Sequence, residues 1–241
     1  MSGTALVTGG ARGIGAATAE ALERAGWRVL AADIDARAVA EADTGWCAAG
    51  RAIAGVQLDV TDRAAVGALL DAHGPVTLVV NNAAVPADML PFADLTAPQF
   101  ERALRINVLG SFIVGQEAAR RMTGGAIVNI ASRGYLGGIG GAHYVASKAA
   151  VVGLTRAMAI ELRWRGIAVN AVAPGMVDTR MIKHFTPAMR ARLTELEPSG
   201  GALDPQVIAD TIVFLASPAG RAMSGQVLLV DGGKALGVAL Y

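Results

Sequence analysis

Short runs of consecutive apolar residues alternate along this chain with longer segments whose apolar positions recur at helical spacing. A strand that is apolar on consecutive residues has both faces covered, which is typical of a parallel sheet between helices. Strands that alternate with helices are joined by right-handed crossovers. We therefore predict an α/β fold, a doubly wound parallel sheet in a three-layer αβα sandwich. The predicted strands are 4–7, 28–32, 55–58, 76–80, 126–130, 167–172 and 226–230.

No repeat, low-complexity tract or polar linker divides the chain, so we expect a single domain over residues 1–241. The segment 178–202 is more weakly patterned than the rest, and Pro198 and a Gly200-Gly201 pair stand near its end. Such a segment after the sixth strand could be a lid over a substrate, or an ordinary packed helix and loop. Its apolar residues are Met181, Ile182, Phe185, Met189 and Leu193.

Composition narrows the class of protein. The 241 residues are 53% hydrophobic and 17% charged, which describes a globular chain with a sizeable core. The net charge of +1 and the scattered basic residues argue against nucleic acid and anionic membranes as partners. The single cysteine, Cys47, can form neither an internal disulfide nor a cysteine-based metal site. With no basic leader and no long apolar stretch, we expect a cytoplasmic protein without a metal.

A glycine-rich turn follows the first predicted strand. Gly9, Gly13 and Gly15 lie in the sequence Thr-Gly-Gly-Ala-Arg-Gly-Ile-Gly, and a helical pattern begins immediately afterwards. Glycines at these positions permit a tight turn and let backbone N–H groups approach a pyrophosphate. The strand before, the helix after and Asp33 about twenty residues on give the context that a dinucleotide site requires.

Asp33 bears on which dinucleotide binds. Its carboxylate can accept hydrogen bonds from the adenosine ribose, whereas its charge opposes the extra phosphate of NADP, so NAD is favoured. Arg12 and Arg37 count against this, since either could contact a 2′-phosphate. Asp59, after the third strand, could bind adenine or cap the helix that starts near Asp62.

A second candidate site contains Ser132, Tyr144 and Lys148. In a helix, Tyr144 and Lys148 would share one face, so the ammonium group could stabilise the deprotonated phenol and lower its pKa. This spacing is common and weak evidence alone. Ser132, however, follows a strand, at the edge where open α/β sheets bind ligands. A carbonyl being reduced needs a hydrogen-bond donor and a proton source at its oxygen, and Ser132 and Tyr144 suit these two roles.

Taken together, these residues resemble the short-chain dehydrogenase/reductase family over nearly the whole chain. The matching pieces are Thr8 to Gly15, Asp59, Asn81-Asn82-Ala83-Ala84, Asn107, Ser132, Tyr144 with Lys148, Pro174-Gly175 with Thr179, and Val230-Asp231-Gly232-Gly233. The resemblance implies a Rossmann fold, and several matches in the right order are far more specific than any one of them.

The resemblance also implies a role for each matching residue. Tyr144 would be the general acid/base, and Lys148 would lower its pKa and bind the nicotinamide ribose. Ser132 would bind the substrate oxygen, and Asn107 would hold a water that links Lys148 to solvent. The predicted cofactor-binding set is Gly9, Arg12, Gly13, Ile14, Gly15, Asp33, Asp59, Val60, Asn81, Ala83, Tyr144, Lys148, Pro174, Val177 and Thr179.

The sequence departs from the family pattern at two places. Ala84 replaces the usual last glycine of the Asn-Asn-Ala-Gly motif, and the interval from Ser132 to Tyr144 is one residue shorter than in many members. The glycine-rich loop 133–142 can absorb the change, and its shape bears on substrate choice. We interpret His143 as a surface or capping residue. Three tryptophans are predicted to be packing residues: Trp27, Trp46 and Trp164.

We therefore predict an NAD-dependent oxidoreductase that interconverts a secondary alcohol and its ketone. The alternatives are a 3-oxoacyl-thioester (acyl-carrier-protein) reductase that uses NADPH, a non-catalytic dinucleotide-binding regulator, and a non-redox lyase or epimerase on the same fold. The resemblance further implies a homotetramer or homodimer. Consistent with that, the segment 149–162 is apolar around much of its circumference, and the tail 235–241 is nearly all apolar.

Overall fold

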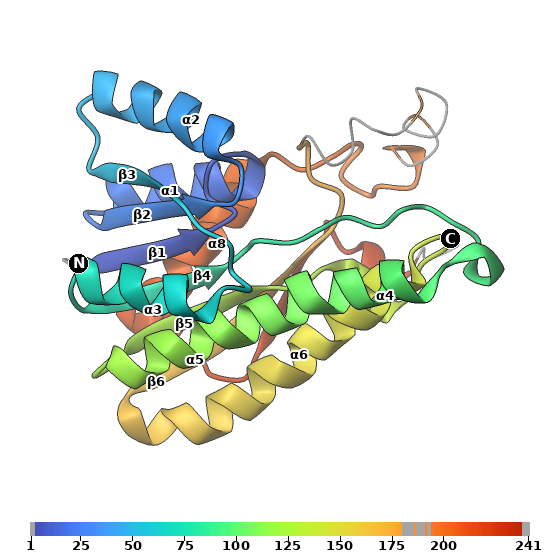
Figure 1. Ribbon diagram of the computed structural model, residues 1–241. Helices are drawn as coiled ribbons and strands as arrows, with labels where there is room; N and C mark the ends of the chain where they lie inside the picture. Colours follow the sequence, from blue (N-terminus) through green and yellow to red (C-terminus); the bar gives the residue numbers. More distant parts are fainter. Residues whose placement is uncertain (1–2, 180–185, 187–190, 192–193, 238–241) are drawn as a thin grey trace.

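The computed structural model, which describes residues 3–179, 186, 191 and 194–237, contains a seven-stranded parallel sheet between two layers of helices (Figure 1). The strand order is β3-β2-β1-β4-β5-β6-β7. The chain thus builds the sheet outward from β1 in one direction and from β4 in the other, which confirms the doubly wound α/β prediction. The strands are β1 (Thr4–Thr8), β2 (Arg28–Asp33), β3 (Ile53–Gln57), β4 (Val76–Asn81), β5 (Gly125–Ile130), β6 (Ile167–Pro174) and β7 (Val227–Val230).

The helices cover the two faces of the sheet. Helices α1, α2 and α8 pack on one face and α3, α5 and α6 on the other (Figure 1). The described α-helices are α1 (Gly13–Arg24), α2 (Ala36–Ala48), α3 (Arg63–Ala72), α4 (Ala97–Leu104), α5 (Ser111–Arg121), α6 (Ala142–Leu162), α8 (Pro205–Ala216) and α9 (Pro218–Arg221). Single-turn elements are Phe92–Asp94, Arg133–Leu136, Arg163–Arg165 and Lys234–Leu236, and a π-helical turn occupies Arg105–Gly110.

Each predicted strand is present, and the third differs most in its bounds. It runs from Ile53 to Gln57, two residues earlier than predicted at its start. Ile53 is buried, and Gly55 packs so closely under α2 that a Cβ there would lie 2.9 Å from the Asp43 Cβ. The Gly55 N–H also donates to the Asp43 carboxylate at 2.7 Å, which fixes α2 against this edge strand.

Two of the three tryptophans pack as predicted. Trp27 and Trp46 are 7% and 5% exposed and belong to the core on the α1 face. The prediction for Trp164 is wrong, because its ring is 82% exposed and lies under the Arg163 guanidinium, 4.8 Å from the ring centroid. It follows the end of α6, where the single turn before β6 carries its side chain outside the sheet layers.

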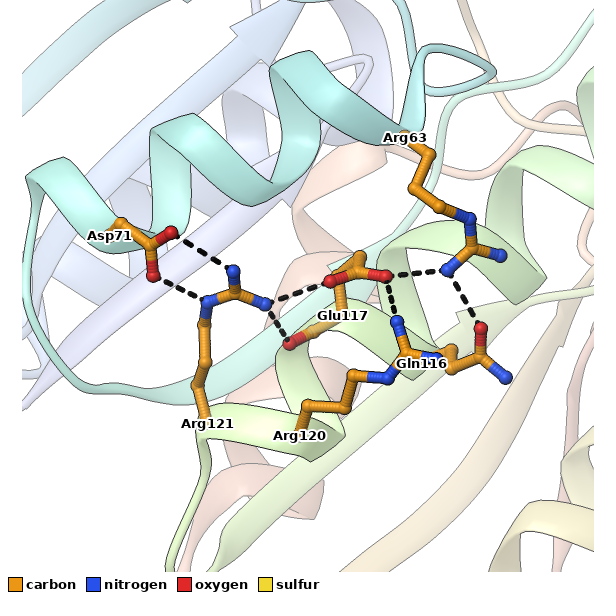
Figure 2. Close-up of polar contacts among 6 residues, drawn as sticks. All are labelled: Arg63, Asp71, Gln116, Glu117, Arg120 and Arg121. Carbon is orange, nitrogen blue, oxygen red and sulfur yellow. Dashed lines mark hydrogen bonds and ion pairs between the residues drawn. The ribbon is translucent and has the colours of Figure 1, made fainter.

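An ion-pair cluster links α3 to α5 beside the sheet (Figure 2). Its centre is Glu117, whose side chain is 7% exposed and which pairs with Arg121 at 2.8 Å, Arg63 at 2.5 Å, and also Arg120. Arg121 in turn binds Asp71 through two hydrogen bonds. The hydrogen bond from Arg121 is the main reason that the pKa of Glu117 lies below its usual value.

Replacing Glu117 with Gln should destabilise the fold, because three guanidinium groups then lose their shared carboxylate. We expect the free energy of unfolding to fall by about 1–3 kcal/mol at pH 7 in urea titrations. Because the folded pKa of Glu117 is depressed, its contribution is present above the unfolded pKa and is lost as the pH falls through the folded pKa. The matched control is Glu41→Gln, which removes an exposed pair with Arg37 and should leave the midpoint unchanged. Equal effects of the two variants would contradict the prediction.

Candidate active site

The glycine-rich turn lies at the carboxyl end of β1 and leads into α1. A Cβ at Gly15 would lie 2.0 Å from the Gly9 carbonyl oxygen, and one at Gly9 would lie 2.9 Å from Nδ2 of Asn82, so both positions require glycine. Gly13, with φ of +54°, has only Thr179 near its missing Cβ, at 3.4 Å. The backbone is therefore tightly packed on its inner side and open on the side of the cleft, which fits a bound pyrophosphate.

Asn82, whose side chain was not assigned a role from the sequence, fixes this turn. Its Nδ2 donates to the carbonyl oxygens of Thr8 and Gly9, each at 3.0 Å, and its backbone N–H donates to the Thr8 hydroxyl. The preceding residue, Asn81, faces the other way: it is 3% exposed and donates to the Asn129 side chain at 2.8 Å. The expectation that Asn81 supports the cofactor is therefore wrong for its side chain. Side chains alternate along a strand, and that alternation was the signal for this difference.

A cleft of about 1760 Å³ lies beside the turn, at the carboxyl edge of the sheet. Of the predicted site residues it is lined by Gly9, Arg12, Gly13, Ile14, Asp33, Asp59, Val60, Ala83, Ser132, Tyr144, Lys148, Pro174, Val177 and Thr179. Gly15, Asn81 and Asn107 do not line it. The structure thus brings both groups of predicted residues, the glycine turn and the Ser-Tyr-Lys set, to one cleft.

Asp33 ends β2 beside the glycine turn. Its carboxylate accepts hydrogen bonds from the backbone N–H groups of Ala11, at 3.4 Å, and Asp35, at 3.1 Å. Arg12 does not reach toward open space, because its guanidinium pairs with the Asp35 carboxylate at 2.5 Å. That contact is also the main cause of the lowered pKa of Asp35. An arginine already engaged by a carboxylate is a weaker ligand for an additional phosphate.

Asp59 lies in the turn after β3 and lines the cleft. Its carboxylate accepts hydrogen bonds from the backbone N–H and the hydroxyl of Thr61, both at 2.8 Å. The cap of α3 is instead Asp62, which accepts from the N–H of Ala65 at 3.0 Å. Of the two interpretations of Asp59, helix capping is therefore wrong; that Asp59 binds adenine stays a prediction, and its place in the cleft lining is compatible with it.

Tyr144 and Lys148 lie in α6, as their spacing predicts. Lys148 is 3% exposed, and its Nζ donates to the Ile130 carbonyl at the end of β5, at 2.7 Å. The same Nζ is 5.7 Å from the centroid of the Tyr144 ring. The lysine is thus fixed between the helix and the strand end rather than against the phenol oxygen.

Burial affects the pKa values of both members of this pair, and the effect of Lys148 on the pKa of Tyr144 stays a prediction. Burial raises the pKa of Tyr144 above its usual value, and a hydrogen bond from Ser132 partly opposes that rise. Burial also lowers the pKa of Lys148 to about 8, because its ammonium group has left water. A lysine with this pKa carries less charge near neutrality. The phenol is consequently protonated at neutral pH.

Ser132 follows β5 and starts a single turn of 3₁₀-helix. Its hydroxyl oxygen accepts a hydrogen bond from the Gly134 N–H at 3.0 Å, so its position is fixed from one side. In the rest of the loop, Gly137 and Gly140 have φ values of +129° and +74°, which other residues rarely adopt. A Cβ at Gly140 would also lie 3.2 Å from the Met89 backbone. The shortened loop is therefore compatible with the site because its glycines take these conformations.

Asn107 lies behind the cleft in the π-helical turn between α4 and α5. It is 1% exposed, its Oδ1 accepts from the Val85 N–H at 2.8 Å, and its Nδ2 donates to the Ser147 hydroxyl at 2.9 Å. The side chain thus joins the loop after β4 to α6, next to the residues that carry the predicted chemistry. Apolar spacing alone does not distinguish a π turn from an α-helix, so this detail was not predictable.

His143 was predicted to be a surface or capping residue, and that prediction is wrong. It is 2% exposed, and its Nε2 accepts from the Asp88 N–H at 3.3 Å. The Asp88 carboxylate is 3.6 Å from the same nitrogen. The ring is buried because the loop after β4 passes over the first turn of α6. Its contact with Asp88 ties that loop to the helix that carries Tyr144.

Two remaining predictions concern Ala84 and the lid candidate 178–202. Ala84 lines the cleft, and so do Leu196 and Glu197 at the end of the lid candidate 178–202. Glu197 pairs with Lys234, and both residues line the cleft. The apolar residues proposed for the lid lie outside the described residues: Met181, Ile182, Phe185, Met189 and Leu193.

Within the described part of the chain, no helix is both long enough and apolar enough to span a bilayer. The same residues contain no group of three or more His, Cys, Asp or Glu side chains placed to hold a metal ion.

Comparison with known proteins gives consistent matches along the chain. Residues 9–235 match the family model described as Enoyl-(Acyl carrier protein) reductase. The chain is 38% identical to the (2S)-[(R)-hydroxy(phenyl)methyl]succinyl-CoA dehydrogenase subunit BbsD of Thauera aromatica, covering 96% of each chain. It is 36% identical to the 3-oxoacyl-[acyl-carrier-protein] reductase MabA of Mycobacterium bovis, covering 98% of this chain and 94% of that one. A crystal structure of an actinorhodin polyketide ketoreductase variant with NADPH superposes with a TM-score of 0.90 at 33% identity, covering 97% of each chain.

Proposed function

The chain belongs to the short-chain dehydrogenase/reductase family, and from that premise we propose that it is an NAD-dependent oxidoreductase that interconverts a secondary alcohol and its ketone. The observation that carries the proposal is the shared cleft, which is lined both by Ser132, Tyr144 and Lys148 and by the glycine turn. A proton-transfer group and a dinucleotide site so placed can act on the same substrate carbon.

Each residue of the site has a defined task in this proposal. Hydride chemistry is supplied by the nicotinamide dinucleotide when it is bound in the cleft. Tyr144, protonated because burial raises its pKa, gives a proton to the carbonyl oxygen during reduction and takes one from the alcohol during oxidation. Ser132 donates a hydrogen bond to the same oxygen as its negative charge develops.

Lys148 and Asn107 support this chemistry from behind. Lys148 binds the ribose next to the nicotinamide, with its Nζ already held at the Ile130 carbonyl. Asn107 fixes the spacing between α6 and the loop after β4 through Ser147 and Val85, and we assign it the water that connects Lys148 to solvent. Because Tyr144 must be deprotonated to act as a base, alcohol oxidation is favoured at higher pH than ketone reduction.

The preference for NAD rests on the charges around the adenosine end. Asp33 places a carboxylate at the end of β2, where it opposes a 2′-phosphate. The two arginines that could have bound that phosphate are both paired, Arg12 with Asp35 and Arg37 with Glu41. Because the ketoreductase structure compared above contains NADPH, the preference between NAD and NADP has to be measured directly.

We expect the purified protein to turn over NAD(H) at least about tenfold more efficiently than NADP(H), with a panel of secondary alcohols and ketones followed by nicotinamide absorbance. Replacing Asp33 with Ser should reduce or reverse that preference, mainly through the KM for NADP(H), because the carboxylate charge is gone. Replacing the exposed Asp94, away from the cleft, gives a matched control for the loss of one charge. A native preference for NADPH would overturn the NAD assignment, and no turnover with either cofactor would overturn the oxidoreductase assignment.

A second candidate is a 3-oxoacyl-thioester reductase that uses NADPH, favoured by the similarity to MabA and by the description of the matching family model. It predicts efficient reduction of acyl-carrier-protein or coenzyme A thioesters in the same assay. The presence of Ser132, Tyr144 and Lys148 at one cleft counts against a non-catalytic regulator. We also propose self-association, because Ile160 and Trp164 at the end of α6 are 61% and 82% exposed.

A further inference from the structure

We propose that Arg133 binds a carboxylate group of the substrate, so that the enzyme acts on secondary hydroxy acids and their oxo acids. This inference rests on the proposed function, and it goes beyond it by naming the substrate class. It starts from the position of Arg133, which directly follows Ser132 and lines the same cleft.

Among the residues that the structure describes, the guanidinium of Arg133 has no hydrogen-bond or ion-pair partner. Its Nε is shielded from solvent and makes no hydrogen bond, and within the described residues no carboxylate forms an ion pair with this side chain. Five other arginines near the surface are each paired with a carboxylate: Arg12, Arg37, Arg63, Arg120 and Arg121. A shielded donor without an acceptor is costly, and a cleft-lining one is suited to a ligand that supplies the acceptor.

None of the five acidic residues that line the cleft forms an ion pair with Arg133 among the described residues: Asp33, Asp59, Asp88, Glu101 and Glu197. Asp88 contacts His143 and Gln99, and Glu197 pairs with Lys234. The sequence between Thr179 and Thr194 carries no aspartate or glutamate, so that segment brings no carboxylate to Arg133 either. Among the described residues no carboxylate pairs with Arg133, which leaves its donors available to a bound anion.

Two further arginines line the same cleft, beside one glutamate, Glu101. Arg102 and Arg105, one helical turn apart at the junction of α4 and the π turn, both line the cleft and are exposed. Neither side chain forms a hydrogen bond or an ion pair within the described part of the chain. Such a lining favours anionic over neutral substrates before the specific contact at Arg133 forms.

A carboxylate fits Arg133 better than the phosphates of a carrier thioester. Arg133 directly follows Ser132 and both line the cleft, so we expect its guanidinium to meet a group near the substrate carbon that faces Ser132. The phosphates of coenzyme A or of a carrier protein are separated from the acyl carbons by the long pantetheine chain. A planar guanidinium can also bind a carboxylate through two parallel hydrogen bonds.

The test compares secondary hydroxy acids, their methyl esters and their coenzyme A thioesters as substrates of the enzyme with NAD⁺. We expect the native enzyme to favour each acid over its ester, and Arg133→Gln to lower kcat/KM for the acids by about 10–100-fold, chiefly through KM. The esters should be unaffected, and Arg133→Lys should recover part of the loss. Arg156→Gln, an exposed arginine of α6 outside the cleft, is the matched control.

Three results would overturn the subsite: equal losses for acids and esters, esters preferred over acids by the native enzyme, or a larger loss for the thioesters. Calorimetric titration of a hydroxy acid into the enzyme–NAD⁺ complex measures binding at the subsite independently of turnover. If no substrate is turned over, yet acid binding is lost in Arg133→Gln and kept in Arg156→Gln, the proposed function fails and the subsite stands. If esters are turned over and acids do not bind, the subsite fails and the proposed function stands.

Discussion

Replacing Tyr144 with Phe should lower kcat by about 10²–10⁴-fold in both directions, because the substrate oxygen then loses its proton donor and acceptor. The phenol hydroxyl is buried in the wall of the cleft, and its hydrogen bond with Ser132 is the polar contact that affects its pKa. Removing it leaves the ring and its packing in place. NADH affinity, measured by fluorescence titration, and the unfolding midpoint should therefore stay close to native values.

Tyr135→Phe is a matched control for Tyr144→Phe. Tyr135 belongs to the single turn after Ser132, packs against a small core cluster and does not line the cleft. Its loss of a hydroxyl should change kcat by less than about twofold, since no proton transfer depends on it. If Tyr144→Phe retained native turnover on a substrate that the native enzyme accepts, Tyr144 would not be the acid/base.

A second large effect is expected for Gly15→Ala. Its Cβ would lie 2.0 Å from the Gly9 carbonyl oxygen and 2.8 Å from Nδ2 of Asn82, so the turn must shift to admit one methyl group. We expect NADH affinity to fall by at least about 100-fold, because backbone N–H groups of the turn no longer point at the pyrophosphate together. The unfolding midpoint should also fall. Calorimetry with NADH and urea titration measure the two effects.

Gly45→Ala controls for the general effect of adding a methyl group to a helix. Gly45 lies inside α2, and a Cβ there would have no neighbour within 4 Å. This variant should bind NADH normally and be more stable by about 0.5–1 kcal/mol, as glycine-to-alanine changes in helices usually are. If Gly15→Ala matched Gly45→Ala in NADH affinity and stability, the turn would not be as tightly packed as its geometry indicates.

The sheet was predictable because its strands are buried on both faces, so their apolar residues run consecutively. β5 and β6 are buried along their whole lengths, and their predicted bounds differ from the observed ones by one and two residues. β3 lies at the edge of the sheet with only Ile53 buried, and its apolar signal was correspondingly less exact. The motifs at the carboxyl edge were predictable for another reason: each combines a rare residue pattern with a strand end.

The remaining differences from prediction concern the burial and the contact partners of residues, which depend on segments distant in the sequence. Burial of His143 depends on a loop that passes over α6, and exposure of Trp164 depends on a turn outside the layers. The partner of Lys148 is a backbone carbonyl 18 residues away in sequence, which no side-chain pattern reveals. Burial raises the pKa of Tyr144 and lowers that of Lys148, an effect of the surroundings that the spacing of the two residues does not reveal.

The amide of Asn82 bears on the order in which the protein folds. Its hydrogen bonds to the Thr8 and Gly9 carbonyls span 74 and 73 residues of chain, so they form only after β4 has docked beside β1. Contacts this far apart in sequence carry a large loop-closure entropy and form slowly. We therefore expect the glycine turn to reach its final geometry late in folding, so that the onset of dinucleotide binding during refolding reports when the two halves of the sheet have joined.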